Sequence, residues 1–317
     1  MAFDLHNPTS LTETPGTAIS RRSALALMLG APGVLDGAAD PNAPLRFAIS
    51  ETVVAEVNMN DARPAMQVWI QRMGQELSIV IDPKIISPTP EIQERTRKGQ
   101  VDAVAINVIE YRPIAELLDS NQIITSAGAS GLDQYMILVK QDSGIRQLGD
   151  LKGRRLCMLK NPKMCVAPAW LNNILDEGHH GPAEQFFGSM AADAKFSRVV
   201  LPVFFGQADA CLTSKHGFDT MCELNPQVAR ELKVLASSPA MVVNFYIFRK
   251  NYQSPNREKL LRAFLSLRAT PAGGQLAALF QFDELSVQHA ACLAPALGVL
   301  DAADRARSAR SAGGRKG

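Results

Sequence analysis

The chain has 317 residues, of which 46% are hydrophobic, 20% charged and 6% aromatic. This length and composition allow two domains with hydrophobic cores, and they exclude disorder, collagen and coiled coil. The longest apolar run, residues 24–35, is interrupted by Gly30, Pro32 and Gly33. It is shorter than the roughly 20 residues of a membrane-spanning helix, so we expect no transmembrane helix.

The formal net charge is +2, and it is unevenly distributed along the chain. Residues 1–39 carry −1 and residues 301–317 carry +3, which leaves residues 40–300 neutral. A protein that binds the phosphate backbone of nucleic acid carries a basic stripe on its folded body. We therefore expect no nucleic-acid partner.

The first 39 residues have the three-part layout of an export signal. Arg21 and Arg22 precede the apolar run, and the small residues at 37–39 follow it. Paired arginines before a weakly hydrophobic run are typical of the twin-arginine type. Cleavage near Ala39 would release the body into the periplasm. The alternative is a disordered N-terminus that happens to contain two arginines.

The body is expected to alternate strands and helices, which is typical of sheets covered on both faces. A strand over 45–49 is followed by a polar loop and a helix over 63–77. A helix starting at Thr89 and Pro90 ends at Gly99, and a buried strand covers 101–106. The pattern restarts after a strand over 135–139. The later elements are strands at 156–159, 208–212, 234–236 and 243–248 and helices at 167–177 and 255–267. Two α/β lobes joined by two crossings, with a cleft between them, account for this order.

Several sequence stretches resemble phosphate/phosphonate-type periplasmic substrate-binding proteins of ABC importers. The first are Gly99-Gln100-Val101-Asp102-Ala103 and the segment 142–155, which match "GxVDxA" and "DSxIxxLxDLKGKR". Residues 206–210, 231–234, 238–239 and 249–250 continue the match in the same order, over about residues 45–285. The resemblance implies a type II periplasmic-binding fold. Its first lobe would comprise 44–134 and 242–300, and its second lobe 135–241.

Members of this family capture an oxyanion between the lobes and deliver it to a membrane permease. They use hydroxyls and backbone N–H groups at a helix start in the second lobe. Here residues 161–166 replace the family's Ser-Thr-Ser-Gly loop and contain no hydroxyl. Lys163 could supply a charge instead, or could be a solvated loop lysine. The softer wall of Met164 and Cys165 favours an organic anion such as a phosphonate, sulfonate or carboxylate.

The other candidate contacts follow from topology, because ligands gather at the carboxyl ends of strands in open α/β sheets. Asp209 matches an acidic position of the family, or is a structural strand residue. Tyr135 and Asn244 lie at the crossings and could belong to the hinge. The complete set of expected ligand-binding residues is Glu51, Thr52, Asn107, Tyr111, Tyr135, Asn161, Lys163, Met164, Cys165, Asp209, Thr213 and Ser214.

The sequence contains none of the common catalytic or metal-binding motifs. GxSxG, GxxxxGK[ST], GxGxxG after the first strand and HExxH are all missing, and the adjacent pair His179-His180 lies in a turn. The five cysteines, at 157, 165, 211, 222 and 292, have no metal-type spacing. They are buried thiols, or two of those between 157 and 222 form a disulfide. We expect no catalytic residue, metal or cofactor.

The predicted protein is thus a monomeric binding protein for a small anion, working with an ABC permease. A ligand-sensing subunit for a membrane sensor kinase is an alternative from another class. A third is an enzyme with Cys165 as nucleophile, its thiol pKa lowered by Lys163 and a helix start. The basic tail, 301–317, is expected to be disordered, with contact to anionic lipid as the alternative.

Overall fold

The computed structural model describes residues 43–54, 59–86, 89–127, 131–279 and 284–313, and the expected export signal lies outside these ranges. A first six-stranded sheet has the order β11-β4-β10-β3-β1-β2. Its strands are β1 (Leu45–Ser50), β2 (Ile81–Ile86), β3 (Ala103–Asn107), β4 (Leu118–Ser126), β10 (Asn244–Arg249) and β11 (Leu285–Gln288). β2, β1 and β3 are parallel, so their carboxyl ends lie at one edge of the sheet.

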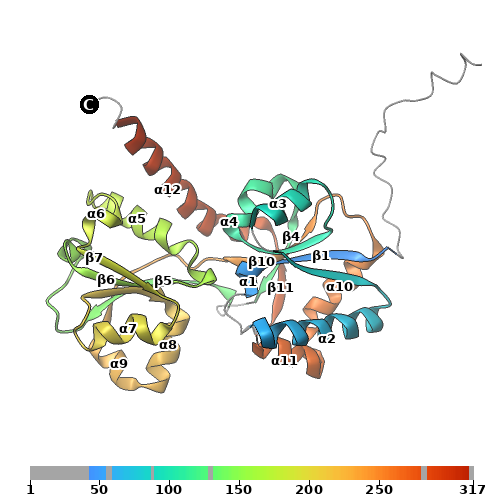
Figure 1. Cartoon of the computed structure of the whole chain (residues 1–317), viewed down its shortest axis with the longest axis horizontal. Coiled ribbons are helices and arrows are strands. Elements are labelled where there is room, and N and C mark those ends of the chain that lie inside the picture. Colours follow the sequence, from blue (N-terminus) through green and yellow to red (C-terminus); the bar gives the residue numbers. More distant parts are fainter. Residues whose placement is uncertain (1–42, 55–58, 87–88, 128–130, 280–283, 314–317) are drawn as a thin grey trace, which may run out of the picture. The chain divides into compact units, whose positions relative to one another are not determined.

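Helices accompany this sheet to form the first lobe (Figure 1). They are α1 (Glu51–Val54), α2 (Met59–Leu77), α3 (Thr89–Arg97), α4 (Val108–Tyr111), α10 (Pro255–Leu265) and α11 (Pro271–Leu279), with 3-10 turns η1 (Arg112–Leu117), η5 (Leu267–Ala269) and η6 (Ala290–Leu293). Phe47, Tyr246 and Phe264 pack with ring centroids 5.1–6.2 Å apart. Ser254 caps α10 by accepting a hydrogen bond from the Asn256 N–H, as the Ser-Pro start predicts.

A second sheet of five strands has the order β7-β6-β8-β5-β9. Its strands are β5 (Tyr135–Lys140), β6 (Arg155–Leu159), β7 (Ser189–Asp193), β8 (Ala210–Ser214) and β9 (Leu232–Ser237). The accompanying helices of this second lobe are α5 (Ala167–Glu177), α6 (Ala183–Phe186), α7 (Phe196–Phe204), α8 (Lys215–Leu224) and α9 (Pro226–Glu231), with 3-10 turns η3 (Leu148–Leu151) and η4 (Pro162–Met164). β7, β6 and β8 are parallel neighbours. The predicted α/β fold class with two sheets is confirmed.

The two chain segments that run between the sheets pair with each other. Asp133 and Met241 form an antiparallel bridge. The Tyr135 N–H donates to Ser238 Oγ at 2.8 Å, and Gln134 Nε2 donates to the Ser238 carbonyl at 2.9 Å. These bonds tie both crossings into one short ribbon, which is where a hinge between the lobes would bend.

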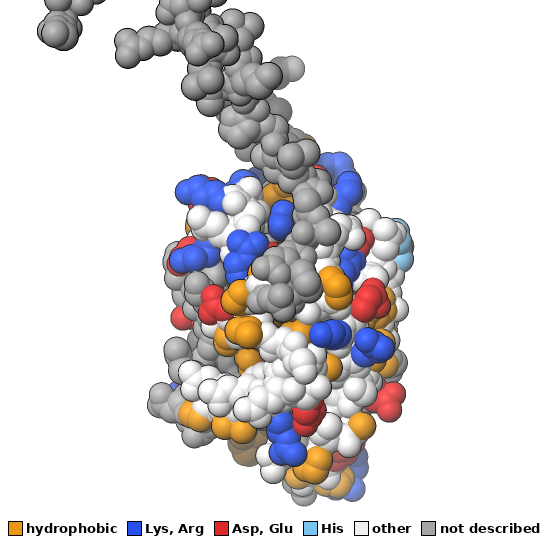
Figure 2. Space-filling model, turned by 90° about the vertical axis from the view of Figure 1, so that its right-hand side faces the viewer, with side chains coloured by type: hydrophobic (Ala, Val, Ile, Leu, Met, Phe, Trp, Pro, Cys, Tyr) orange, Lys and Arg blue, Asp and Glu red, His pale blue; other side chains and the backbone are white. Residues whose placement is uncertain are grey.

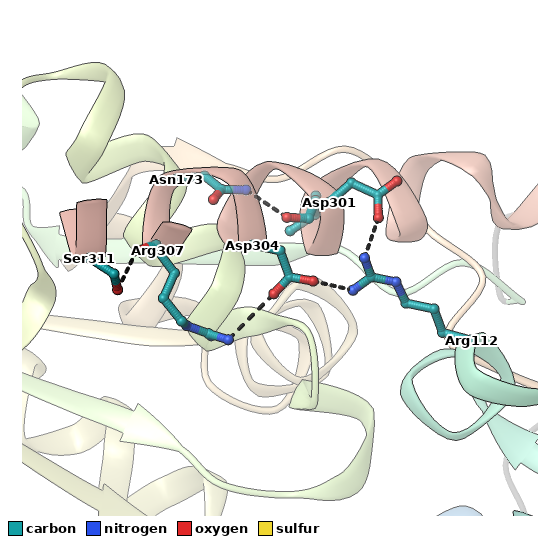
Figure 3. Close-up of polar contacts among 7 residues, drawn as sticks. Arg112, Asn173, Asp301, Asp304, Arg307 and Ser311 are labelled. Atoms are coloured by element: carbon teal, nitrogen blue, oxygen red, sulfur yellow. Dashed lines mark hydrogen bonds and ion pairs between the residues drawn. The ribbon is translucent and has the colours of Figure 1, made fainter. Parts of the chain in front are cut away.

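The expectation of a disordered tail is wrong for residues 301–313, because they belong to helix α12 (Ala294–Gly313). α12 follows η6 and runs beside α5, where Asn173 Nδ2 donates to the Val299 carbonyl at 2.9 Å. Arg112 of η1 pairs with both Asp301 and Asp304 at 2.6 Å (Figure 3). Further along, Arg310 Nη1 lies 2.7 Å from both carboxylate oxygens of Asp176 on α5. α12 is therefore a strap that contacts both lobes.

Other departures from the expected elements concern their ends. α2 begins at Met59 and carries Pro64 within it, although a loop was expected there. β8 covers 210–214, two residues later than expected. All five cysteines are free thiols, so the expected disulfide alternative is wrong; Cys211 is buried and the other four are half-buried. Within the described ranges, no helix combines the length and apolarity needed to cross a bilayer.

Charge is mixed on the surface of the first lobe. On the face seen in Figure 2, basic and acidic side chains are interspersed with apolar ones. This agrees with the zero net charge of residues 40–300.

Candidate functional site

A cavity of about 1600 Å³ is lined by residues of both lobes. Most of its lining comes from the carboxyl ends of β6, β7 and β8 and from the first turns of α7 and α8. The first lobe contributes Arg268, Ala277 and Ala278, and the crossing before β5 contributes Leu132 and Asp133. Of the twelve predicted site residues, Asn161, Lys163 and Ser214 line this cavity.

The loop after β6 is closed on itself by hydrogen bonds. Asn161 caps η4, and its Oδ1 accepts from the Met164 N–H at 3.1 Å. The Cys165 N–H donates to the Pro162 carbonyl at 3.2 Å. Two backbone donors that an anion-binding loop would offer are thus already used. From this loop the cavity receives Asn161, Pro162 and Lys163, whereas Met164 is buried.

Tyr135, the first residue of β5, contacts the same loop. Its side chain is 0% exposed, and its hydroxyl donates to the Lys163 carbonyl at 2.8 Å. Burial raises the Tyr135 pKa well above its ordinary value, so the hydroxyl keeps its proton and stays a donor. Tyr135 acts as a support that positions Lys163.

Cys165 lacks the properties of an activated nucleophile. Burial, followed by the nearby charges of Asp133 and Glu110, raises its pKa to about 12. A thiolate is the reactive form, so the thiol is inert at neutral pH. The premise of the Cys-dependent enzyme, a thiol pKa lowered by Lys163 and a helix start, is wrong.

The first lobe carries a polar network centred on Glu110, which the sequence analysis missed. Glu110 is 1% exposed, and its carboxylate accepts four hydrogen bonds. The donors are Ser50 Oγ at 2.6 Å, Thr89 Oγ1 at 2.8 Å, Thr52 Oγ1 at 2.9 Å and the Asn107 N–H at 3.0 Å. We call these five residues the Glu110 cluster. The signal that could have found it is the capping box formed by Asn107 and Glu110 at the start of α4.

The Glu110 cluster changes the expected role of Thr52 and Asn107. Asn107 Oδ1 caps α4, and Asn107 Nδ2 donates to Thr52 Oγ1 at 3.1 Å. Their polar groups are satisfied within the cluster, which is what buried polar groups require. Glu51 is exposed beside them, and Tyr111 is buried edge-on against Phe245 at 5.4 Å.

The last two predicted residues of β8 differ in environment. Ser214 caps α8 and lines the cavity. Thr213 is 0% exposed, and its hydroxyl oxygen has no hydrogen-bond partner among the described residues.

Asp209 is not brought together with the other candidates. It precedes β8, at the amino end of the strand, and accepts from the Arg155 N–H at 2.9 Å and from Arg155 Nε at 3.0 Å. The hydrogen bond from the Arg155 side chain lowers the Asp209 pKa. These contacts favour the structural alternative, because an aspartate at the amino end of a strand lies at the edge opposite to the cavity.

Sequence reasoning also missed most of the charged lining. The charged side chains around the cavity are Lys160, Lys163, Lys195, Lys215, Arg268, Asp133 and Asp219, with His216 beside them. Three of these lysines follow strand ends closely, which was hidden because β7 was not expected and β8 was placed too early. No group of three or more potential metal ligands occurs within the described part of the chain.

Two α/β lobes joined by paired crossings around a polar cavity define a class, the two-lobed solute-binding proteins. Residues 52–291 match the family model described as "ABC transporter, phosphonate, periplasmic substrate-binding protein". The match covers most of the chain, and the protein belongs to this family. It is therefore a periplasmic substrate-binding protein of the ABC-importer type.

Individual relatives are distant. The phosphonates-binding periplasmic protein of Escherichia coli K12 is 20% identical over 234 residues, which are 71% of this chain and 67% of that protein. A binding protein of a Pseudomonas aeruginosa ABC phosphonate transporter has a TM-score of 0.56 at 16% identity, over 85% of this chain and 89% of that one. A Prochlorococcus marinus protein in complex with methylphosphonate also has a TM-score of 0.56, at 12% identity, over 84% and 99%. At these identities the solved structures show the fold.

Proposed function

We propose that this protein captures a small organic oxyanion in the cavity between its lobes and delivers it to an ABC permease. The observation that carries this proposal is the charge of the lining. Four lysines and one arginine face the cavity against two aspartates. Such an excess of cations concentrates anions and speeds their association.

The loop after β6 favours an organic anion over inorganic phosphate. Recognition of a small tetrahedral anion depends on several short donors, and the loop has no hydroxyl and two of its N–H groups are already bonded. Apolar side chains stand elsewhere in the lining, namely Phe196, Leu201, Met221 and Leu224. An organic group can pack against them while the charged group meets the lysines. Sulfonates have this character, and so do phosphonates, which the Escherichia coli and Prochlorococcus marinus relatives bind.

The remaining parts of the proposal concern export, assembly and chemistry. Residues 1–39 act as a twin-arginine signal that brings the protein to the periplasm. The protein works as a monomer and without catalysis. The raised pKa of Cys165 agrees with the second statement, because it keeps the thiol unreactive. Replacing Arg21 and Arg22 by lysine would block export if this pathway is used, and unchanged export would refute it.

A thermal-shift screen of the full chain tests the ligand class. The panel contains methylphosphonate, other alkyl phosphonates, sulfonates, small carboxylates, phosphate, phosphite and sulfate. We expect a shift with an organic oxyanion at micromolar concentration, which Lys163→Ala removes. Lys152→Ala is the control, because Lys152 is exposed and lies outside the cavity lining. A protein that no anion stabilises would refute the proposal.

A further inference from the structure

Lysines follow the ends of three neighbouring parallel strands of the second sheet. Lys160 comes directly after β6, Lys215 directly after β8, and Lys195 two residues after β7. The sheet order places β6 between β7 and β8, and all three lysines line the cavity. We call them the lysine row. Neighbouring strands are about 4.8 Å apart, so the lysine row extends over roughly 10 Å.

The ends of these strands are held in place by local contacts. The Lys160 N–H donates to the Asp193 carbonyl at 2.9 Å, which fixes the end of β6 against that of β7. The Asp193 carboxylate accepts from the Lys195 N–H at 2.7 Å. The backbone at the end of β6 and just after β7 is therefore set by hydrogen bonds before any ligand arrives.

The carboxylates near the lysine row neutralise only part of its charge. Lys215 pairs with Asp219 one turn along α8. Lys160 and Lys195 are exposed. Lys195 lies near the Asp193 carboxylate, which also pairs with Arg198, whereas Lys160 has no ion pair among the residues that the structure describes. Like charges on neighbouring strands repel each other. An anion that reaches along the row would relieve this repulsion, whereas one small anion can meet only part of it.

We propose that the cavity takes a linear polyanion, a chain of two or three linked phosphoryl or phosphonyl groups, laid along the lysine row. This inference rests on one part of the proposed function, the capture of an anion between the lobes, and assigns that anion several linked charged groups in place of one. Lys163 and Arg268 line the same cavity, so the row adds to a site that is already basic. The missing hydroxyl loop agrees with it, because recognition here depends on charge spread over several strands and not on one tight oxyanion pocket.

The test compares two probes, tripolyphosphate and methylphosphonate, by titration calorimetry of the full chain in metal-free buffer. We expect tripolyphosphate to bind at least about tenfold more tightly than methylphosphonate, as two further ionic contacts would give. Lys195→Gln and Lys215→Gln should each lower tripolyphosphate affinity by about fivefold and reduce the ratio of the two affinities. Lys152→Gln is the matched control and should change neither affinity. Circular dichroism of each variant verifies that it folds.

The outcomes separate this inference from the proposed function. If methylphosphonate binds as tightly as tripolyphosphate, or if both row variants leave the ratio unchanged, the polyanion is refuted and the organic oxyanion stands. If tripolyphosphate alone binds, the lysine row is supported and the organic monoanion fails. If neither probe binds, the row inference fails, and the screen described above decides the proposed function.

Discussion

Replacing Glu110 by glutamine should destabilise the protein by about 2–4 kcal/mol, because the Glu110 cluster depends on both carboxylate oxygens. Ser50 and Thr89 donate to Oε1, and Thr52 and the Asn107 N–H donate to Oε2. In glutamine one of these oxygens becomes an NH₂ group, so either amide orientation loses two acceptor bonds.

The magnitude follows from the environment of the group. Each hydrogen bond to a buried charged group contributes about 1.5–3 kcal/mol, and the loss of the buried charge recovers part of this by removing a desolvation cost. Rotation of the hydroxyls offsets a further part, since they can accept from the new NH₂.

Equilibrium urea unfolding measures the effect, with the midpoint falling and the slope unchanged. Glu116→Gln is the matched control: Glu116 lies on neighbouring η1, is exposed, and should change stability by less than about 0.5 kcal/mol. A Glu110→Gln cost below about 1 kcal/mol would show that the cluster does not hold α1 and α4 through the two carboxylate oxygens.

Three further predictions concern the strap, the second lobe and Cys165. Arg112→Gln removes two exposed ion pairs to α12, so the free energy of unfolding should fall by about 0.5–2 kcal/mol, and by less in high salt. Deuterium exchange of residues 301–313 should become faster. Unchanged exchange would contradict the role of Arg112 in holding α12 to the first lobe. Asp209→Asn should leave anion binding unchanged and cost about 1 kcal/mol at neutral pH. Because the Asp209 pKa is lowered, this cost is present above the unfolded pKa of about 3.9 and disappears as pH falls through the folded pKa, which urea unfolding at several pH values checks. Cys165 should be alkylated far more slowly in the native protein than in urea at pH 8, and equal rates would refute its raised pKa. The same raised pKa makes a contribution to folding stability that is fully present below about pH 9 and is lost as the pH rises toward about 12.

Sequence reasoning succeeded where the signal is local. The Ser254-Pro255 start of α10 and the apolar stripe of α5 both specify their helices within one segment, and the structure has them there. The lysine and asparagine of the loop after β6 were found because the family resemblance places the anion-binding loop there, and both line the cavity.

Elements that depend on distant partners were missed. β7 has mostly exposed residues and no apolar alternation, so its pairing with β6 defines it. α12 reads as a basic, Ala-rich tail, and its buried residues Ala296, Val299 and Ala303 become a stripe only when a helix such as α5 covers them. The Glu110 cluster joins segments around residues 50, 89 and 107, which no sequence window contains.

The two lobes contribute different things to binding. In the first lobe the polar groups at the strand ends bond to one another in the Glu110 cluster, which does not line the cavity. The cation that the first lobe contributes to the cavity is Arg268. In the second lobe the lysine row follows the strand ends, so most of the electrostatic attraction for an anion comes from this lobe. A ligand would therefore meet mainly cations of the second lobe, with Arg268 as the cation that the first lobe supplies. Because α12 pairs with Arg112 of the first lobe and with Asn173 of the second, both lobes are held to the same helix.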